Sequence, residues 1–174
     1  MASVNDSNNP GTGSRGSAFP VDRPVEALIR DHNLVRKLAD KYLNSDHPEV
    51  KKQCATQILQ ALHMHSQLEE SVFYPAVRAI DPGMIAHFEQ DHQQVDDMLA
   101  SLRGMSLDDQ RTDGLMRELI KMVMDHVQQE ENDFFPKLER AGMDLTQVGL
   151  QMAAFEANLV HMQAQASDQG MRRR

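Results

Sequence analysis

The chain has 174 residues and a net charge of −8, with 40% hydrophobic and only 5% aromatic residues. This length fits one domain that buries its own core, and the negative charge makes nucleic acid a poor candidate partner because no basic surface is expected to meet phosphates. The single cysteine, Cys54, cannot form an internal disulfide, and no apolar run resembles a signal peptide or a membrane span. We therefore expect a soluble, cytoplasmic protein that contacts neither nucleic acid nor membrane.

Hydrophobic periodicity divides the chain into four regions. Residues 1–22 are polar and lack periodicity, which predicts a disordered N-terminal arm. Residues 23–142 repeat apolar positions every three or four residues in four segments, which predicts an all-α fold, an up-and-down antiparallel four-helix bundle. Residues 143–166 predict a further C-terminal helix, and residues 167–174 a tail. We expect this helix to pack on the outside of the bundle, with a contact between two copies as the alternative.

Turn-forming residues delimit the predicted helices. Pro24 suits the first turn of the first helix, and Asp81-Pro82-Gly83 marks the turn into the third. Gly142 closes the fourth. Pro75 and Pro136 are expected to end or kink the second and fourth helices, because proline lacks an N–H and its ring clashes with the preceding turn.

One stretch of the sequence occurs twice. His65-Ser-Gln-Leu-Glu69-Glu70-Ser-Val-Phe-Tyr-Pro75 returns as His126-Val-Gln-Gln-Glu130-Glu131-Asn-Asp-Phe-Phe-Pro136, and each copy is preceded by an Asp-His pair, Asp31-His32 and Asp91-His92. The His-x-x-x-Glu spacing places imidazole and carboxylate one turn apart on one helix face. The two halves together supply six candidate metal ligands: His32, His65, Glu69, His92, His126 and Glu130.

All six candidates share the face of the apolar residues. A carboxylate that faces a core costs several kcal/mol unless it is paired or coordinated, so the placement indicates a bound cation. Imidazole and carboxylate together suit iron, manganese or zinc. Six ligands are too many for one tetrahedral zinc, whereas two carboxylates can bridge two ions and leave positions open for a small ligand. The sequence predicts a dinuclear iron centre, with zinc or manganese as substitutes.

Other polar residues near the motifs have less defined roles. His87 and Glu89 are candidates for an additional ligand or a supporting residue, and with Tyr42 they are the available acid or base groups. Glu70 and Glu131, the second members of the two Glu-Glu pairs, are expected to point away from the centre.

The order of these motifs resembles the hemerythrin-like family, also called HHE cation-binding domains, over residues 24 to about 140. The resemblance implies a four-helix bundle around an oxo- or hydroxo-bridged, non-haem di-iron centre. By position, the resemblance makes the four histidines terminal ligands and the two glutamates bridges: His32, His65, His92, His126, Glu69 and Glu130.

The sequence also departs from the oxygen-carrying members of that family. Those members have a fifth histidine one turn before the equivalent of His92, where Phe88 stands here, and an Asp five residues after the equivalent of His126, where Glu130 follows after four. The chain is more similar to bacterial members linked to oxygen or nitric oxide sensing, stress response and iron–sulfur repair. Repair-type members carry a separate cysteine-bearing N-terminal domain, which we do not expect here.

Three functions follow from these observations. The first is a di-iron protein that binds or reacts with O2, NO or peroxide in sensing, buffering or stress response. The second is a di-iron enzyme that turns over peroxide or NO, or acts in iron–sulfur repair. The third is a metal-stabilised interaction module, monomeric or paired through its C-terminal helix.

Overall fold

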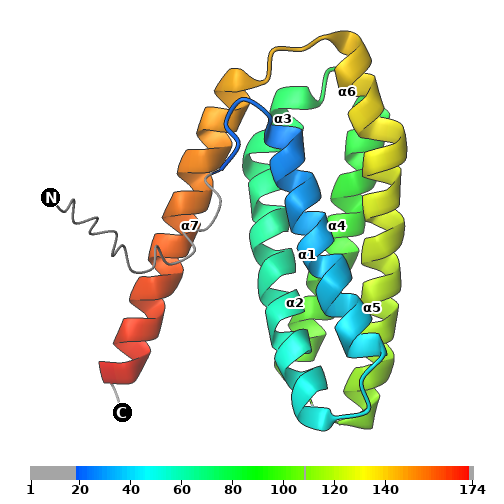
Figure 1. Cartoon of the computed structure of the whole chain (residues 1–174), viewed down its shortest axis with the longest axis vertical. Helices are drawn as coiled ribbons and strands as arrows, with labels where there is room; N and C mark the ends of the chain where they lie inside the picture. The colour runs from blue at the N-terminus through cyan, green and yellow to red at the C-terminus, as the bar shows by residue number, and fades with distance from the viewer. Residues whose placement is uncertain (1–18, 108, 173–174) are drawn as a thin grey trace, which may run out of the picture.

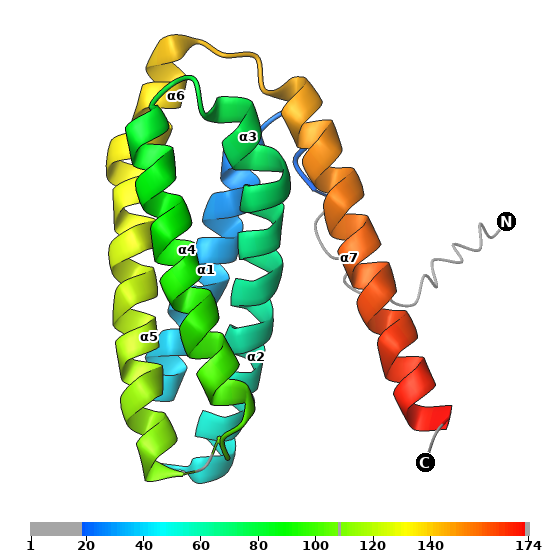
Figure 2. The ribbon, with the colours of Figure 1, turned by 180° about the vertical axis from the view of Figure 1, so that it is seen from behind.

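The computed structural model describes residues 19–107 and 109–172, and Figures 1 and 2 show a four-helix bundle with one further helix beside it. Successive helices of the bundle run in opposite directions, which confirms the predicted fold class. Its four long helices are α1 (Pro24–Leu43), α2 (Pro48–Leu68), α4 (Pro82–Arg103) and α5 (Gln110–Gln129). Among the described helices, none is both long and apolar enough to cross a bilayer.

The two helices that carry the repeated motif each pass through a π-helical turn. After α2, η1 (Glu69–Phe73) leads into α3 (Tyr74–Val77), and after α5, η2 (Glu130–Phe134) leads into α6 (Phe135–Ala141). Helical segments continue past Pro75 and Pro136, so of the two expected effects, an end or a kink, the end is wrong. In the wide turns, hydrogen bonds span five residues, from Tyr74 N–H to Glu69 O and from Phe135 N–H to Glu130 O. The proline then stands in the first turn of a new α-helical segment, where no N–H is required.

Capping residues fix several helix ends. The Asp81 side chain accepts a 3.0 Å hydrogen bond from Met84 N, and Asp109 accepts one of 2.9 Å from Arg111 N. Gly142 ends α6 with φ of +61°, a left-handed conformation that favours glycine.

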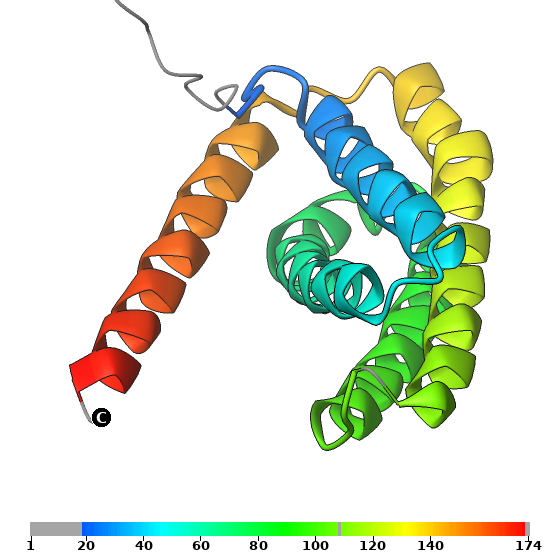
Figure 3. The same ribbon diagram turned by 60° about the horizontal axis from the view of Figure 1, so that its bottom comes forward.

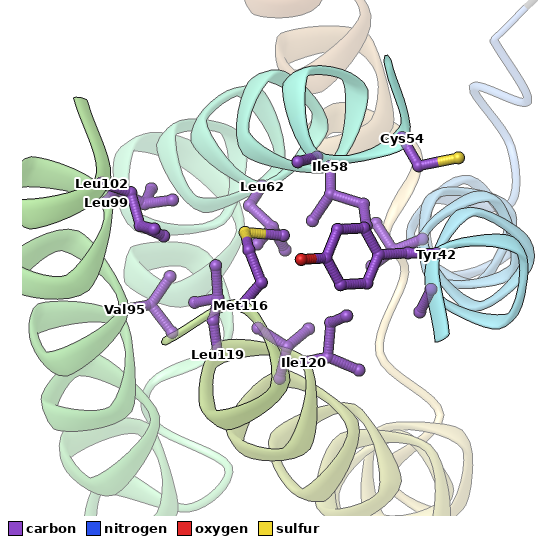
Figure 4. Packing of buried hydrophobic residues seen from close by; sticks show 14 of the residues in the cluster. Tyr42, Cys54, Ile58, Leu62, Val95, Leu99, Leu102, Met116, Leu119 and Ile120 are labelled. Carbon is purple, nitrogen blue, oxygen red and sulfur yellow. The ribbon is translucent and has the colours of Figure 1, made fainter. Parts of the chain in front are cut away.

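Two clusters of buried residues fill the bundle, and the candidate ligands lie between them. Along α1, His32 separates Leu28 of one cluster from Val35 of the other, and His92 separates Phe88 from Val95 in α4 in the same way. The aliphatic cluster, part of which is shown in Figure 4, includes Val35, Tyr42, Ile58, Leu62, Val95, Leu99, Leu102, Met116 and Leu119. The aromatic cluster includes Leu28, Phe73, Tyr74, Ile85, Phe88, Phe134, Phe135 and Met152.

The last helix, α7 (Thr146–Arg172), is longer than expected, because residues 167–172 continue it instead of forming a tail. Met152 is fully buried against the aromatic cluster, so α7 packs on the outside of the bundle. At Gly149 the helix comes so close to the chain before α1 that an added Cβ would lie 1.8 Å from the carbonyl oxygen of Val21. The C-terminal end of α7 lies farther from the bundle (Figure 3). A contact between two copies through α7 stays a prediction.

The expected N-terminal arm is described only in its last residues. Residues 1–18 lie outside the described part of the chain, whereas residues 19–22 form a turn before α1, closed by a 2.9 Å hydrogen bond from Arg23 N to Pro20 O. Phe19 packs against the aromatic cluster. Residues 19–22 thus have a defined structure, and a disordered arm over the preceding residues stays a prediction.

Candidate metal centre

The six candidate ligands lie together in the middle of the bundle, and all are buried. Their donor atoms form two groups, in each of which every atom lies within 4.8 Å of the others. Glu69 belongs to both groups. One group contains His32, His65, Glu69 and Glu130, and the other contains Glu69, His92 and His126.

The carboxylates lie between the two pairs of imidazoles. Glu69 Oε1 is 3.2 Å from His65 Nε2, and its Oε2 is 3.2 Å from His92 Nε2. Glu130 Oε2 is 3.3 Å from His32 Nε2 and 3.5 Å from His126 Nε2. All four Nε2 atoms therefore point toward the same two carboxylates.

These carboxylates are suited to a cation. Within the described residues, Glu69 Oε1 and Glu130 Oε2 are buried and accept no hydrogen bond, although each lies 3.2 Å or 3.3 Å from an imidazole nitrogen. An unpaired buried carboxylate oxygen is costly, and a coordinated cation would remove that cost. Imidazole nitrogens with carboxylate oxygens are donors that iron, manganese and zinc accept. The residues present thus fit a metal pair.

A second carboxylate holds the other ring nitrogen of each histidine. In α1 and α4, His32 Nδ1 lies 2.8 Å from Glu131 and His92 Nδ1 lies 3.0 Å from Glu70. Glu70 and Glu131 lie outside the two donor groups, as expected, but each contacts the outer ring nitrogen of a candidate ligand, which was not expected. Such a carboxylate fixes the ring orientation and makes Nε2 a more basic ligand.

The later histidine of each half is held by the Asp of the Asp-His pair. His65 Nδ1 is 3.4 Å from Asp31, and His126 Nδ1 is 3.2 Å from Asp91. The contacts of one half are thus repeated in the other. The sequence carried a signal for this shell, because the Asp-His and Glu-Glu pairs occur in both copies.

The two halves differ in one cationic side chain, that of Arg36. Arg36 donates two hydrogen bonds to Glu131, of 3.0 Å to Oε1 and 2.7 Å to Oε2. Burial opposes ionisation of Glu131, but Arg36 and His32 outweigh it and lower the pKa of that carboxyl. The position equivalent to Arg36 in the second half is Asp96, so the charges around the two halves differ.

Tyr74 adds to the centre a hydroxyl group that regular helical spacing does not predict there. It donates a 2.6 Å hydrogen bond to Glu130 Oε1 and lies 3.1 Å from Glu69 Oε2, and it is 3.4 Å from Nε2 of both His92 and His126. Burial and the two carboxylates raise its pKa well above the ordinary value, so the phenol stays protonated. The π-turn explains the omission, because it aligns Tyr74 with Glu69, five residues earlier.

The centre combines imidazolium and carboxylate groups in the metal-free protein. Burial opposes the charged form of His92, but hydrogen bonds to Glu69 and Glu70 raise its pKa to about 9. Burial likewise opposes ionisation of Glu69, and His65 and His92 hold its pKa well below the usual range. Metal ions must therefore displace protons when they bind.

Three residues that were candidates for an additional ligand or an acid–base group lie outside the centre. The His87 side chain is 52% exposed and lies 3.6 Å from Asp91, while Glu89 pairs with Arg78, so neither joins the two donor groups. Tyr42 packs in the aliphatic cluster, and its hydroxyl donates a 3.0 Å hydrogen bond to Asp113. Ten residues of helix, roughly 15 Å, separate it from His32. These positions do not support a direct role for the three residues at the centre.

A small inner hollow adjoins the four imidazoles. It has a volume of about 20 Å³ and is otherwise lined mainly by aliphatic side chains, including Val35, Leu62, Val95, Val123 and Val127. This volume accommodates roughly one molecule of the size of water.

Comparisons with known proteins agree with this geometry. The family model for the hemerythrin HHE cation-binding domain matches residues 23–138. A Nostoc sp. protein named DNA nickase is 30% identical over 116 residues, which are 66% of this chain and 33% of that protein, so the chain spans about a third of its length. The crystal structure of a hemerythrin HHE cation-binding domain-containing protein from Mycobacterium kansasii matches with a TM-score of 0.63 and 22% identity, covering 78% of this chain and 88% of that one. At this identity, the likeness to the solved structure shows the fold.

Proposed function

The chain belongs to the hemerythrin family of HHE cation-binding domains, and we propose that it binds two iron ions which bind or react with O2, NO or peroxide in sensing, buffering or stress response. The observation that supports this most directly is the pair of unpartnered, buried carboxylate oxygens among four imidazole nitrogens. His32 and His65 would hold one ion, His92 and His126 the other, and Glu69 and Glu130 would lie between them. Zinc or manganese could occupy the same donors.

The surrounding residues would orient the ligands and exclude bulk water. Iron would supply a redox-active site for a small molecule, and the carboxylates at each Nδ1 would keep the imidazoles directed inward. The inner hollow, of about 20 Å³, limits the ligand to very few atoms. Tyr74 holds a proton on its hydroxyl oxygen beside both glutamates.

The Tyr74 hydroxyl supports a second candidate function, a di-iron enzyme that turns over peroxide or NO. A phenol next to a redox centre is positioned to donate a hydrogen bond to a reacting ligand, while its raised pKa makes it a weak acid. Turnover assays on iron-loaded protein separate the two functions, because a binding protein reacts once per centre and an enzyme reacts many times.

One relative is named DNA nickase, which raises the question of whether this chain acts on DNA. The name describes that protein, and the charge of −8 leads us to expect that phosphate backbones are disfavoured here. Incubation of iron-loaded protein with supercoiled plasmid tests this expectation. Relaxation of the plasmid by the wild type but not by a metal-free sample would place DNA among the partners.

Metal content per chain is the first test of the iron proposal. Protein from iron-replete medium is compared with a variant in which Glu69 and Glu130 are both Ala, and with Glu89→Ala as a control, since Glu89 pairs with Arg78 outside the centre. We expect two irons per chain and an iron absorption band in the wild type and the control, and neither in the double variant. Absence of iron from all three proteins would contradict the proposal.

A further inference from the structure

An outer hollow of about 160 Å³ lies between α7 and the first two helices of the bundle. Five of its lining side chains are apolar. Leu34, which is 50% exposed, places the mouth of the hollow at the surface. The apolar set is Leu34, Ala61, Met64, Leu68 and Leu159.

The outer hollow reaches the candidate metal centre at one pair of residues. Asp31 and His65 line both the outer hollow and the inner hollow beside the four imidazoles. Their contact, 3.4 Å from Nδ1 to Oδ2, is the longest of the four contacts between a histidine Nδ1 and a carboxylate. His65 is also the most exposed of the four histidines, at 8%. This pair therefore separates the two spaces.

Most of the apolar lining positions differ between the two halves of the bundle. The positions equivalent to Leu34, Met64 and Leu68 in the second half are the polar residues Gln94, Asp125 and Gln129. The Asp125 side chain is 56% exposed. Although the two halves have equivalent ligands, three of the lining positions are apolar in the first half and polar in the second.

We propose that small uncharged molecules such as O2 and NO reach the centre through the outer hollow, past Asp31 and His65, and into the inner hollow. This access route rests on the di-iron function proposed above. Weakly hydrated diatomic molecules favour an apolar lining over water. Glu156 of α7 completes the lining, and together with Asp31 it disfavours anions.

Arg30 ties the outer wall to the separating pair. Its Nη2 lies 3.5 Å from Glu156 Oε1 and 3.7 Å from Asp31 Oδ1. A displacement of α7 would therefore displace Asp31, and with it the barrier between the outer and the inner hollow.

Stopped-flow mixing of NO with reduced, iron-loaded protein tests the route. Leu34→Trp places an indole at the mouth of the outer hollow, and Gln94→Trp places the same group at the equivalent position of the other half. We expect association about tenfold slower for Leu34→Trp and unchanged for Gln94→Trp, because only the first substitution narrows the route. Iron content and the final spectrum should be the same in all three proteins. Equal rates in the three proteins, or equal slowing in both variants, would overturn the route.

Xenon binding to metal-free protein provides a readout that needs no iron. We expect saturable xenon-induced shifts of the Ala61 and Met64 methyl resonances in the wild type and in Gln94→Trp, and their loss in Leu34→Trp. Unshifted methyls in the wild type would overturn the route even where iron binds. Shifted methyls in a protein that binds no iron would instead reject the di-iron function and leave the apolar hollow established.

Discussion

The Tyr74 hydroxyl donates a 2.6 Å hydrogen bond to Oε1 of Glu130, a carboxylate carried by the other half of the bundle. The equivalent of Tyr74 in the second copy of the motif is Phe135, whose ring lies parallel to that of His32 at 6.1 Å between centroids. One buried hydroxyl thus distinguishes two otherwise similar sets of ligands.

Replacing Tyr74 with Phe should destabilise the metal-free protein more than the metal-loaded protein. Without the phenol, Glu130 Oε1 loses its donor in a site that is fully buried, at a cost of about 1–3 kcal/mol. A metal ion can supply the missing interaction. Thermal unfolding with and without metal measures the difference. Tyr42→Phe is the control, since Tyr42 bonds to Asp113 outside the centre and should show the same loss in both states.

Replacing Glu70 or Glu131 with Gln should weaken metal binding about 10-fold to 100-fold, because each carboxylate supports the ligand basicity of one histidine. Competition with a chelator, using zinc as the probe, measures the affinity. Glu89→Gln should bind zinc as the wild type does, because Glu89 pairs with Arg78 at the surface. Unchanged affinity in both Glu70→Gln and Glu131→Gln would show that their contacts to histidine do not support binding.

Asp113→Asn should lower stability at neutral pH but not in strong acid. Hydrogen bonds from Lys51 and Arg117, with a third from Tyr42, lower the pKa of Asp113 to about 2. Because this value lies below the unfolded value of about 3.9, the stabilisation is complete above the unfolded pKa and is lost as pH falls toward 2.

Urea unfolding between neutral pH and pH 2 measures this effect. The side chain is 28% exposed, so after screening by solvent we expect a loss of about 1 kcal/mol at neutral pH. Asp125→Asn is the matched control, because that side chain is 56% exposed and pairs with Lys121 within one helix. A deficit in Asp113→Asn that persisted at pH 2 would have a cause other than the charge.

Gly149→Ala should detach α7 from the bundle. The added Cβ would lie 1.8 Å from the carbonyl oxygen and 2.8 Å from the carbonyl carbon of Val21, and these backbone atoms cannot move aside without displacing the chain before α1. Amide hydrogen exchange should become faster in residues 146–172 while the four bundle helices keep their protection. Gly170→Ala, with no atom within 4 Å of the added Cβ, should leave that protection intact.

The four bundle helices and their shared face were predictable because periodicity and the two copies of the motif specify them. The contacts of Glu70 and Glu131 to the histidines were not predicted, for a physical reason. A residue next to the buried face of a helix borders a neighbouring helix, and the sequence pattern does not say which side chain that neighbour presents. Here the neighbour presents His92 to Glu70 and His32 to Glu131.

Tyr74 was missed because ideal helical spacing does not apply across a π-turn. The same turn explains why Pro75 does not end the helix, one of the two effects predicted there, since a proline can stand in the first turn of the segment that follows a wide turn. The extent of α7 was underestimated because its last turns are exposed, and exposed turns lack the apolar periodicity from which helices are recognised.

The two halves of the bundle repeat the same contacts, so two copies of one half could build the same kind of centre. A chain of half this length, associating with a second copy of itself about a twofold axis, would present the same four imidazoles and two inner carboxylates. In such a homodimer, every residue around the centre would occur in both halves. Joining the halves in one polypeptide allows Tyr74 to correspond to Phe135, and Arg36 to Asp96. These single-copy positions are therefore the places where the surroundings of one half of the ligand set can be altered without the same change in the other half.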